Sequence, residues 1–115
     1  MIILMPVKEN KGINSKISSH FGKTPYWAIF NTETQDFRIE KKVSKYGEGG
    51  CVAVDEVINY SPDIIYVLDM GFGAIQRCVG SQIKVKTGNF MVAKEVIDNL
   101  ENLYDLKRGC YGEIN

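Results

Sequence analysis

The stretch IILMPV, Ile2 to Val7, decides the predicted fold, because it is a nearly continuous apolar run. Such a run is typical of a strand that is buried on both faces, as in the interior of an α/β sheet. If this strand is central, later strands must flank it on both sides. The rest of the sequence supplies candidates for each side.

Two further strands are predicted after the polar stretch Lys8 to Ser19. Tyr26 to Phe30 is aromatic and rich in β-formers, and Phe37 to Val43 alternates apolar and charged residues. That alternation is typical of a half-exposed edge strand. Because the link NTETQD is short and polar, the two strands are predicted to form an antiparallel hairpin.

Helices and strands alternate in the second half of the chain. Apolar residues are spaced as one face of a helix after GEGGC (Gly47 to Cys51) and again after Gly71-Phe72-Gly73. Each of these helices leads to an apolar strand, Ile64 to Leu68 and Ile83 to Val85. The pattern predicts parallel strands joined by right-handed crossovers.

A last helix is predicted from Val92 to Tyr104, because apolar residues keep a 3.6-residue period over this range. Asn89 is its predicted N-cap. The tail Lys107 to Asn115 has no such period and is predicted to be flexible, which leaves residues 1–106 as a single domain.

The predicted fold is α/β, with a mixed five-stranded sheet in the order 3-2-1-4-5, strand 2 antiparallel, and flanking helices. The chain changes direction across the sheet between strands 1 and 4. Ligands of open α/β sheets favour the crevice outside the carboxyl ends of the strands at such a point. Two loops should meet there, one carrying Ser19-His20-Phe21-Gly22 and the other spanning Asp69 to Gly73.

Composition limits the classes of function. The chain has 115 residues, enough for one domain, and Lys plus Arg number 14 against 14 Asp plus Glu. No basic cluster indicates nucleic acid, and no apolar stretch approaches the length of a membrane span. We expect a cytoplasmic protein with neither a nucleic acid nor a membrane as partner.

The three cysteines, Cys51, Cys78 and Cys110, are widely spaced and form no CxxC pair, so a disulfide scaffold is not expected. Cys51 falls at the start of a predicted helix, where a thiolate is stabilised, and it suits either metal binding or packing. Cys78 shares an apolar helix face with Ile75 and Val79, which favours packing. Cys110 lies in the predicted tail as an accessible thiol or an incidental residue.

His20 is the only histidine of the chain. Imidazole is a common ligand of transition metals, so His20 is either a ligand or a loop residue that shapes the turn. Gly22 suits a positive φ or a close backbone approach. Gly71 and Gly73, at a helix start, either offer backbone N–H groups to an anion or form only a tight turn.

The residues give little support to catalysis. Asp69 is the one carboxylate that the apolar strands deliver to the predicted crevice, and no evident motif pairs with it. Cys51 and His20 could act as nucleophile and base, but no local signature accompanies them. Binding without turnover fits better.

Three segments in this order, ISSHFGKTPYWAIF, GEGGC and DMGFGAIQRCVGSQIKVKTG, resemble the dinitrogenase iron-molybdenum cofactor biosynthesis family of nitrogenase accessory factor-like carriers. The resemblance covers residues 1 to about 104 and is most specific at Ser18-Ser19-His20-Phe21-Gly22. It implies a ribonuclease H-like fold. It also implies reversible binding of an iron-sulfur cluster or an iron-molybdenum cofactor precursor, held for delivery to another protein.

By position, His20 corresponds to the family's histidine, and Gly71 and Gly73 to its second glycine turn. The predicted metal ligands are His20 and, from its loop position, Cys51. The other predicted cofactor-binding residues are Ser19, Phe21, Gly22, Gly49, Gly50, Gly71 and Gly73. Expected partners are proteins that donate or accept the cluster. The alternative is a module of the same fold that binds a phosphate or nucleotide and no cluster.

Overall fold

A computed structural model of the protein describes residues 1–44 and 50–106. The strands are β1 (Ile2–Val7), β2 (Tyr26–Asn31), β3 (Phe37–Lys41), β4 (Ile64–Tyr66), β5 (Lys84–Thr87) and β6 (Tyr104–Asp105). The α-helices are α1 (Gly50–Val57), α2 (Phe72–Gly80) and α3 (Ala93–Asp98). Short 3₁₀ helices are η1 (Gly12–Asn14), η2 (Phe21–Lys23), η3 (Ile58–Tyr60) and η4 (Leu100–Asn102).

All six strands form one open sheet in the order β3-β2-β1-β4-β5-β6. The central strand is β1, which pairs antiparallel with β2 and parallel with β4. Its residues from Ile3 to Val7 are buried, as expected for a strand that is covered on both faces. The predicted central position of this strand and the order of the first five strands are therefore confirmed.

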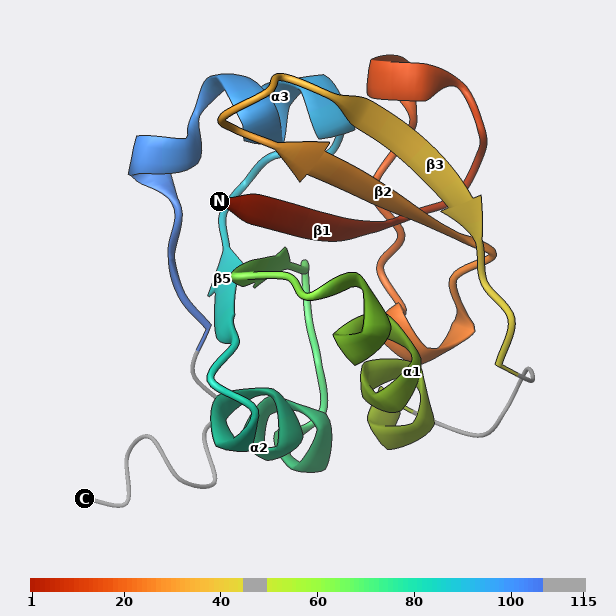
Figure 1. The fold of residues 1–115 in the computed structure, drawn as a ribbon, viewed down its shortest axis with the longest axis vertical. Helices are drawn as coiled ribbons and strands as arrows, with labels where there is room; N and C mark the ends of the chain where they lie inside the picture. Colours follow the sequence, from red (N-terminus) through yellow and green to blue (C-terminus); the bar gives the residue numbers. More distant parts are fainter. Residues whose placement is uncertain (45–49, 107–115) are drawn as a thin grey trace.

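Helices cover both faces of this sheet, with α1 and α2 on one side and α3 on the other (Figure 1). Leu4 of β1 belongs to the apolar core beneath α1 and α2. Ile3 and Met5 belong to the core beneath α3, because successive residues of a strand point to opposite faces. In the described part of the chain no helix is both long and apolar enough to cross a membrane.

The predicted last helix is wrong in its length and in its N-cap. α3 ends at Asp98, and its N-cap is Val92 instead of Asn89. Asn99 stops the helix, with φ at −131° and its side-chain amide donating to the Glu95 carbonyl at 2.9 Å. The apolar residues beyond this point, Leu100 and Leu103, still pack on the core, but from η4 and the segment after it.

The structure also corrects the predicted number of strands. The chain after η4 is extended and adds β6 to the sheet, antiparallel to β5. Lys86 and Asp105 form an ion pair across these two strands at 2.8 Å. The sheet therefore has six strands where five were predicted. The ribonuclease H-like assignment stays a prediction, and the predicted flexible tail lies outside the described residues.

Candidate functional site

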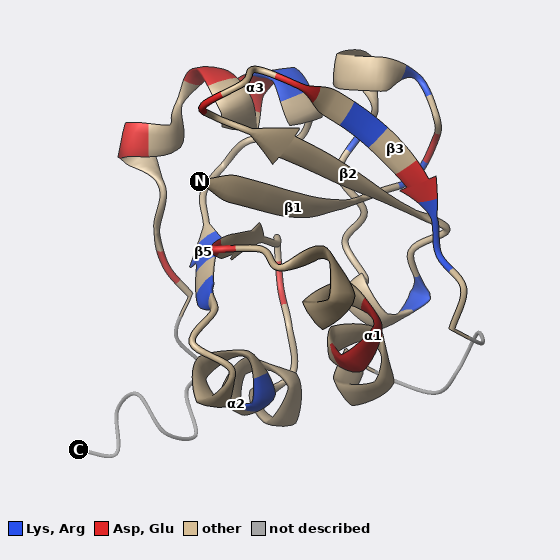
Figure 2. Ribbon diagram, viewed as in Figure 1, with Lys and Arg blue, Asp and Glu red and all other residues tan. Residues whose placement is uncertain are grey.

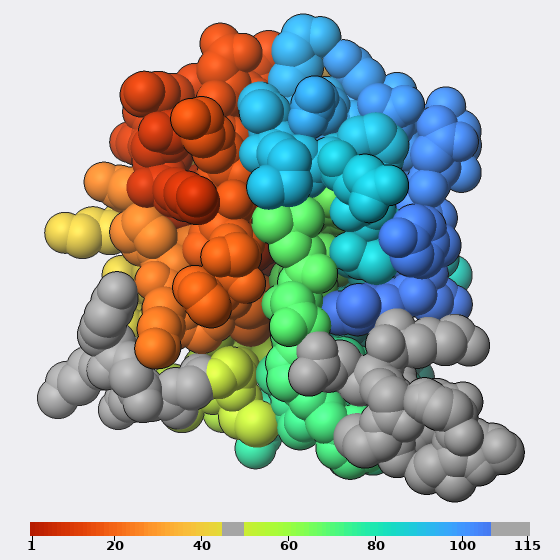
Figure 3. All heavy atoms as spheres, turned by 180° about the vertical axis from the view of Figure 1, so that it is seen from behind, coloured from red at the N-terminus to blue at the C-terminus, as the bar shows by residue number. Residues whose placement is uncertain are grey.

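Two loops meet outside the carboxyl ends of β1 and β4, as the strand order predicted. They border a cavity of about 270 Å³, here called the loop pocket. Its lining residues are Ser19, His20, Phe21, Gly22, Lys23, Gly50, Asp69, Met70 and Gly71. Figure 3 shows the orange segment around residue 20 beside the green segment around residue 70. Residues far apart in the sequence thus form one site.

The first loop is held by local hydrogen bonds and by one buried ring. The Ser18 hydroxyl accepts a bond from the His20 N–H at 3.3 Å, and the Lys23 N–H donates to the His20 carbonyl at 3.1 Å. Phe21 is only 3% exposed, and its ring centroid lies 5.0 Å from that of Trp27. With Phe21 anchored, the neighbouring His20 stays exposed at the pocket.

Lys42, the residue directly after β3, forms a hydrogen bond with the same loop. The Lys42 ammonium donates to the Gly22 carbonyl at 2.7 Å. Gly22 lies in η2 and does not have a positive φ, so that part of the prediction is wrong. Among the described glycines, only Gly12 has a positive φ, of 62°. Lys42, which lies just after β3 and outside the predicted site, therefore holds the Gly22 carbonyl of the pocket loop in position.

The second loop ends at Gly71, the N-cap of α2. Gly71 has φ −67° and ψ 156°, which other residues also adopt, and a Cβ added there would meet no atom within 4 Å. Gly50 differs, since a Cβ there would lie 3.0 Å from the Ala74 Cβ. Gly50 is therefore needed for the close approach of α1 to α2, whereas Gly71 is not required by packing.

Neither Cys51 nor Gly73 is among the described residues that line the loop pocket. They lie one and two residues after the lining residues Gly50 and Gly71, respectively. A Cβ on Gly73 would lie 3.5 Å from the Cys51 sulfur. The pKa of Arg77 is raised, first by a hydrogen bond to the Cys51 side chain and then by the negative charge and hydrogen bond of Asp55. The charge of Cys51 adds a smaller effect in the same direction. Cys51 thus lies between the starts of α1 and α2, beside a guanidinium.

Cys78 behaves as the packing residue that was predicted. It is 0% exposed, and burial, followed by the charge of Cys51, raises the pKa of its thiol to about 12. A thiol with this pKa stays protonated near neutral pH and is a poor metal ligand. Gly49 and Cys110 lie outside the described residues.

No set of three or more His, Cys, Asp or Glu side chains that could hold a metal ion occurs within residues 1–44 and 50–106. Among the described residues, the pocket lining instead combines one imidazole, one ammonium, one carboxylate and the start of a helix. Sequence reasoning missed Lys23 as a lining residue, whereas Met70 lies within the predicted loop from Asp69 to Gly73. Lys23 could have been included, because it directly follows Gly22, a predicted residue of the same loop.

Solved structures of similar fold include the following two. One is the NMR structure of a NifB-like protein from Thermotoga, with a TM-score of 0.75, 17% identity, and coverage of 94% of this chain and 97% of that chain. The other is the apo form of the orange protein from Desulfovibrio gigas, with a TM-score of 0.80, 12% identity, and coverage of 91% of this chain and 92% of that chain. No curated protein matches the chain. Identities this low establish the fold alone.

A family model gives a stronger result than these structures. The model described as dinitrogenase iron-molybdenum cofactor matches residues 1–104, which include both loops of the pocket and all three α-helices. This range agrees with the extent of the resemblance in the sequence. The chain therefore belongs to the dinitrogenase iron-molybdenum cofactor family.

Proposed function

We propose that this protein binds an iron-sulfur cluster or an iron-molybdenum cofactor precursor at the loop pocket and holds it for delivery to a partner protein. The observation that carries the proposal is the meeting of the His20 loop and the Gly71 turn around one cavity. Family membership supports a part in cofactor biosynthesis. The partners would be the proteins that donate and accept the cluster.

The chemistry of the pocket suits an anionic, sulfide-rich cargo. The exposed imidazole of His20 offers a nitrogen ligand for iron. The start of α2 carries the positive end of a helix dipole, and Lys23 adds a full positive charge, whereas Asp69 is the one carboxylate among the described lining residues. Few side-chain ligands favour release, which a carrier requires as much as binding.

Cys51 is the proposed second ligand. Its side chain is partly exposed, and it follows Gly50, which lines the pocket. Thiolates are the usual ligands of iron-sulfur clusters. The other residues proposed to contact the cargo are Ser19, Phe21, Gly22, Gly49, Gly50, Gly71 and Gly73.

The second candidate is a module that binds a phosphate or nucleotide without a cluster. Lys23 and the start of α2 favour it, because an ammonium and a helix N-terminus are common partners of phosphate groups. Protein prepared without oxygen that takes up no iron, yet is stabilised against heat by phosphate or a nucleotide, would replace the cluster proposal with this one.

We expect the substitution His20→Ala to lower cluster uptake several-fold, because it removes the one imidazole at the pocket. Cys51→Ala should lower uptake as well. Protein reconstituted anaerobically with ferrous iron and sulfide would be assayed for bound iron and acid-labile sulfide.

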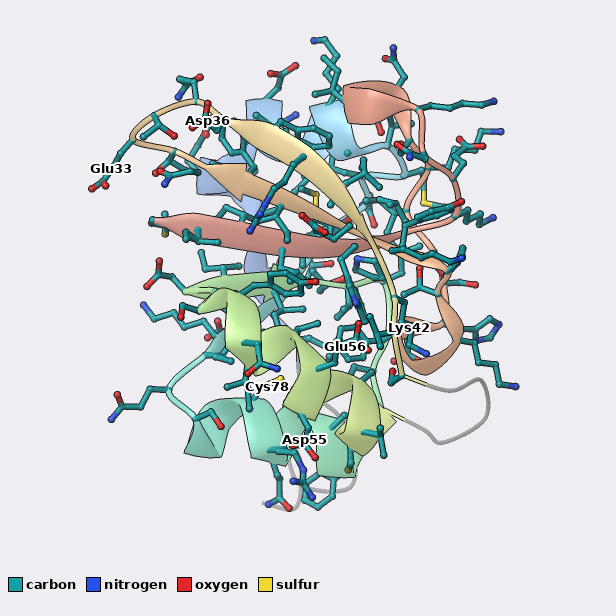
Figure 4. All side chains as sticks on the ribbon, turned by 45° about the vertical axis from the view of Figure 1, so that its right-hand side comes forward. Glu33, Asp36, Lys42, Asp55, Glu56 and Cys78 are labelled. Carbon is teal, nitrogen blue, oxygen red and sulfur yellow. The ribbon has the colours of Figure 1, made fainter. Side chains whose placement is uncertain are left out.

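Two matched variants serve as controls. Cys78→Ala removes a thiol that is buried away from the pocket, and Glu33→Ala changes an exposed residue of the β2–β3 turn (Figure 4). Circular dichroism would confirm that each variant folds. Equal uptake by wild type, His20→Ala and Cys51→Ala would remove both residues as ligands.

Gly71 allows the sign of the cargo's charge to be tested. Gly71→Asp and Gly71→Asn should both fold, since Gly71 has open space around it and Asp and Asn are good N-caps. Only the Asp variant adds a negative charge at the start of α2. We expect it to bind the cluster about 2- to 5-fold more weakly than the Asn variant, as a helix-end charge effect would give. Equal uptake by the two variants would argue against an anionic cargo at this position.

A further inference from the structure

β3 is an edge strand of the sheet, because among the described residues it pairs with β2 alone. Each of its five residues is at least partly exposed. Figure 4 shows β3 in the foreground, with Asp36 near one end and Lys42 near the other. Figure 2 shows basic and acidic segments along the same strand. Such an edge can add another strand unless its charges prevent pairing.

The pairing with β2 determines which backbone groups of β3 point outward. The Asn31 N–H donates to the Asp36 carbonyl at 2.9 Å, and the Lys42 N–H donates to the Pro25 carbonyl at 3.0 Å. Hydrogen-bonded pairs alternate along an antiparallel ladder, so Arg38 and Glu40 also bond toward β2. The N–H and C=O groups of the intervening residues, Phe37, Ile39 and Lys41, therefore point away from the sheet.

The residues one and three positions on either side of Ile39 carry charges of opposite sign. If two copies of β3 pair antiparallel with Ile39 opposite Ile39, Arg38 of each copy lies opposite Glu40 of the other. In the same register Asp36 lies opposite Lys42. No like charges face each other from position 36 to position 42, and opposite charges that face each other across strands are stabilising.

We propose that β3 is a docking surface for a second copy of this chain, which pairs through its own β3 about a two-fold axis at Ile39. This register uses every outward backbone group of β3: Ile39 bonds Ile39, and Phe37 bonds Lys41, in both directions. The charge register and the hydrogen-bond register therefore require the same centre. A strand with unrelated charges could form the same backbone hydrogen bonds but would not place opposite charges across from each other.

The side chains of Arg38 and Glu40 are partly exposed, and the Arg38 guanidinium lies 5.6 Å from the centre of the Tyr60 ring. Arg38 and Glu40 form an ion pair within the strand at 3.2 Å, with side-chain exposures of 57% and 38%. Lys42 donates to Gly22, but an ammonium has two further donors for Asp36 of the second copy. No residue of β3 lines the loop pocket.

Charge reversal tests the proposed register. Arg38→Glu and Glu40→Arg each place like charges opposite one another, and either alone should raise the dimer dissociation constant about tenfold. An equimolar mixture of the two variants restores opposite charges across the strands, so a heterodimer should form with wild-type affinity. The double variant should dimerise like the wild type. Sedimentation velocity on the full chain, up to about 1 mM, would measure these states.

Ile39→Pro tests the backbone contact separately. The N–H that proline lacks is the one that points outward at Ile39, so the hydrogen bonds with β2 are kept. Edge strands also tolerate proline. We expect this variant to remain monomeric and folded, with amide exchange in the wild-type dimer slowed at Phe37, Ile39 and Lys41. A wild type that stays monomeric at the highest concentration overturns the proposal. So does a dimer that survives Ile39→Pro, or a mixture of the charge variants that fails to associate.

Discussion

Replacement of Trp27 by alanine should lower the free energy of unfolding by about 4 kcal/mol, the largest effect expected of a single substitution in this chain. Trp27 is 0% exposed and contacts two parts of the structure. Its ring packs on Phe21 in the pocket loop, and its indole N–H donates to the Glu56 carboxylate in α1 at 3.0 Å. The substitution would leave a cavity and release both contacts.

Urea unfolding followed by circular dichroism would measure this loss, because the chain has no second tryptophan for fluorescence. Trp27→Phe keeps an aromatic ring and should cost about 2 kcal/mol. Tyr104→Ala is the surface control, since Tyr104 is 56% exposed and its loss should change stability by about 0.5 kcal/mol or less. A cost below about 1 kcal/mol for Trp27→Ala would contradict its role as the link between the pocket loop and α1.

Glu56→Ala should produce the second largest effect, about 3 kcal/mol. The Glu56 carboxylate accepts the Trp27 indole N–H and the backbone N–H groups of Val43 and Ser44, the last two at 2.7 Å. Removing the carboxylate leaves the Trp27 donor inside the core without a partner. Glu56→Gln keeps one acceptor oxygen and should cost about half as much. Urea unfolding at pH 7 would compare the two variants.

The same carboxylate makes stability depend on pH. Burial acts to raise the pKa of Glu56, but hydrogen bonds from Val43, Trp27 and Ser44 outweigh burial and lower the pKa below its ordinary value of 4.5. The unfolded chain therefore takes up this proton at a higher pH than the folded chain. The contribution of Glu56 is present above about pH 4.5 and is lost as pH falls through the folded-state pKa. Glu56→Gln should lose less stability than the wild type between pH 5 and pH 3, and equal losses would contradict this account.

The position of the site could be predicted because topology rules leave few arrangements. An apolar first strand, a hairpin and two crossovers place the loop after β1 beside the loop after β4. That reasoning brought the His20 loop and the turn at Gly71 together without any knowledge of side-chain contacts. It also placed Asp69 at the pocket, where the structure finds it.

Residues that act through distant contacts could not be predicted. Glu56 binds Trp27 and the backbone near Val43, and nothing in the sequence around Glu56 indicates either partner. Lys42 reaches the Gly22 carbonyl from the segment just after β3. These contacts depend on tertiary packing, which local patterns do not encode.

The last helix was mispredicted because different backbones can place apolar residues at the same spacing. Leu100 lies in a 3₁₀ turn and Leu103 just beyond it, yet both contact the core as helical residues would. The side-chain amide of Asn99, bonded to the Glu95 carbonyl, offers the backbone an alternative to further helical bonds. A periodicity argument detects the contacts and not the backbone that makes them.

The pairing of β1 with β4 also determines when the binding site can arise during synthesis. β1 to β3 are consecutive and can associate as a meander early, whereas Ile3 pairs with Ile64 and must wait for it. Contacts between residues so distant in sequence form late and close slowly. A nascent chain that ends before Gly71 therefore carries His20 without the opposite wall of its pocket. The order of the strands alone therefore delays completion of the loop pocket until β4 and the turn at Gly71 have been synthesised.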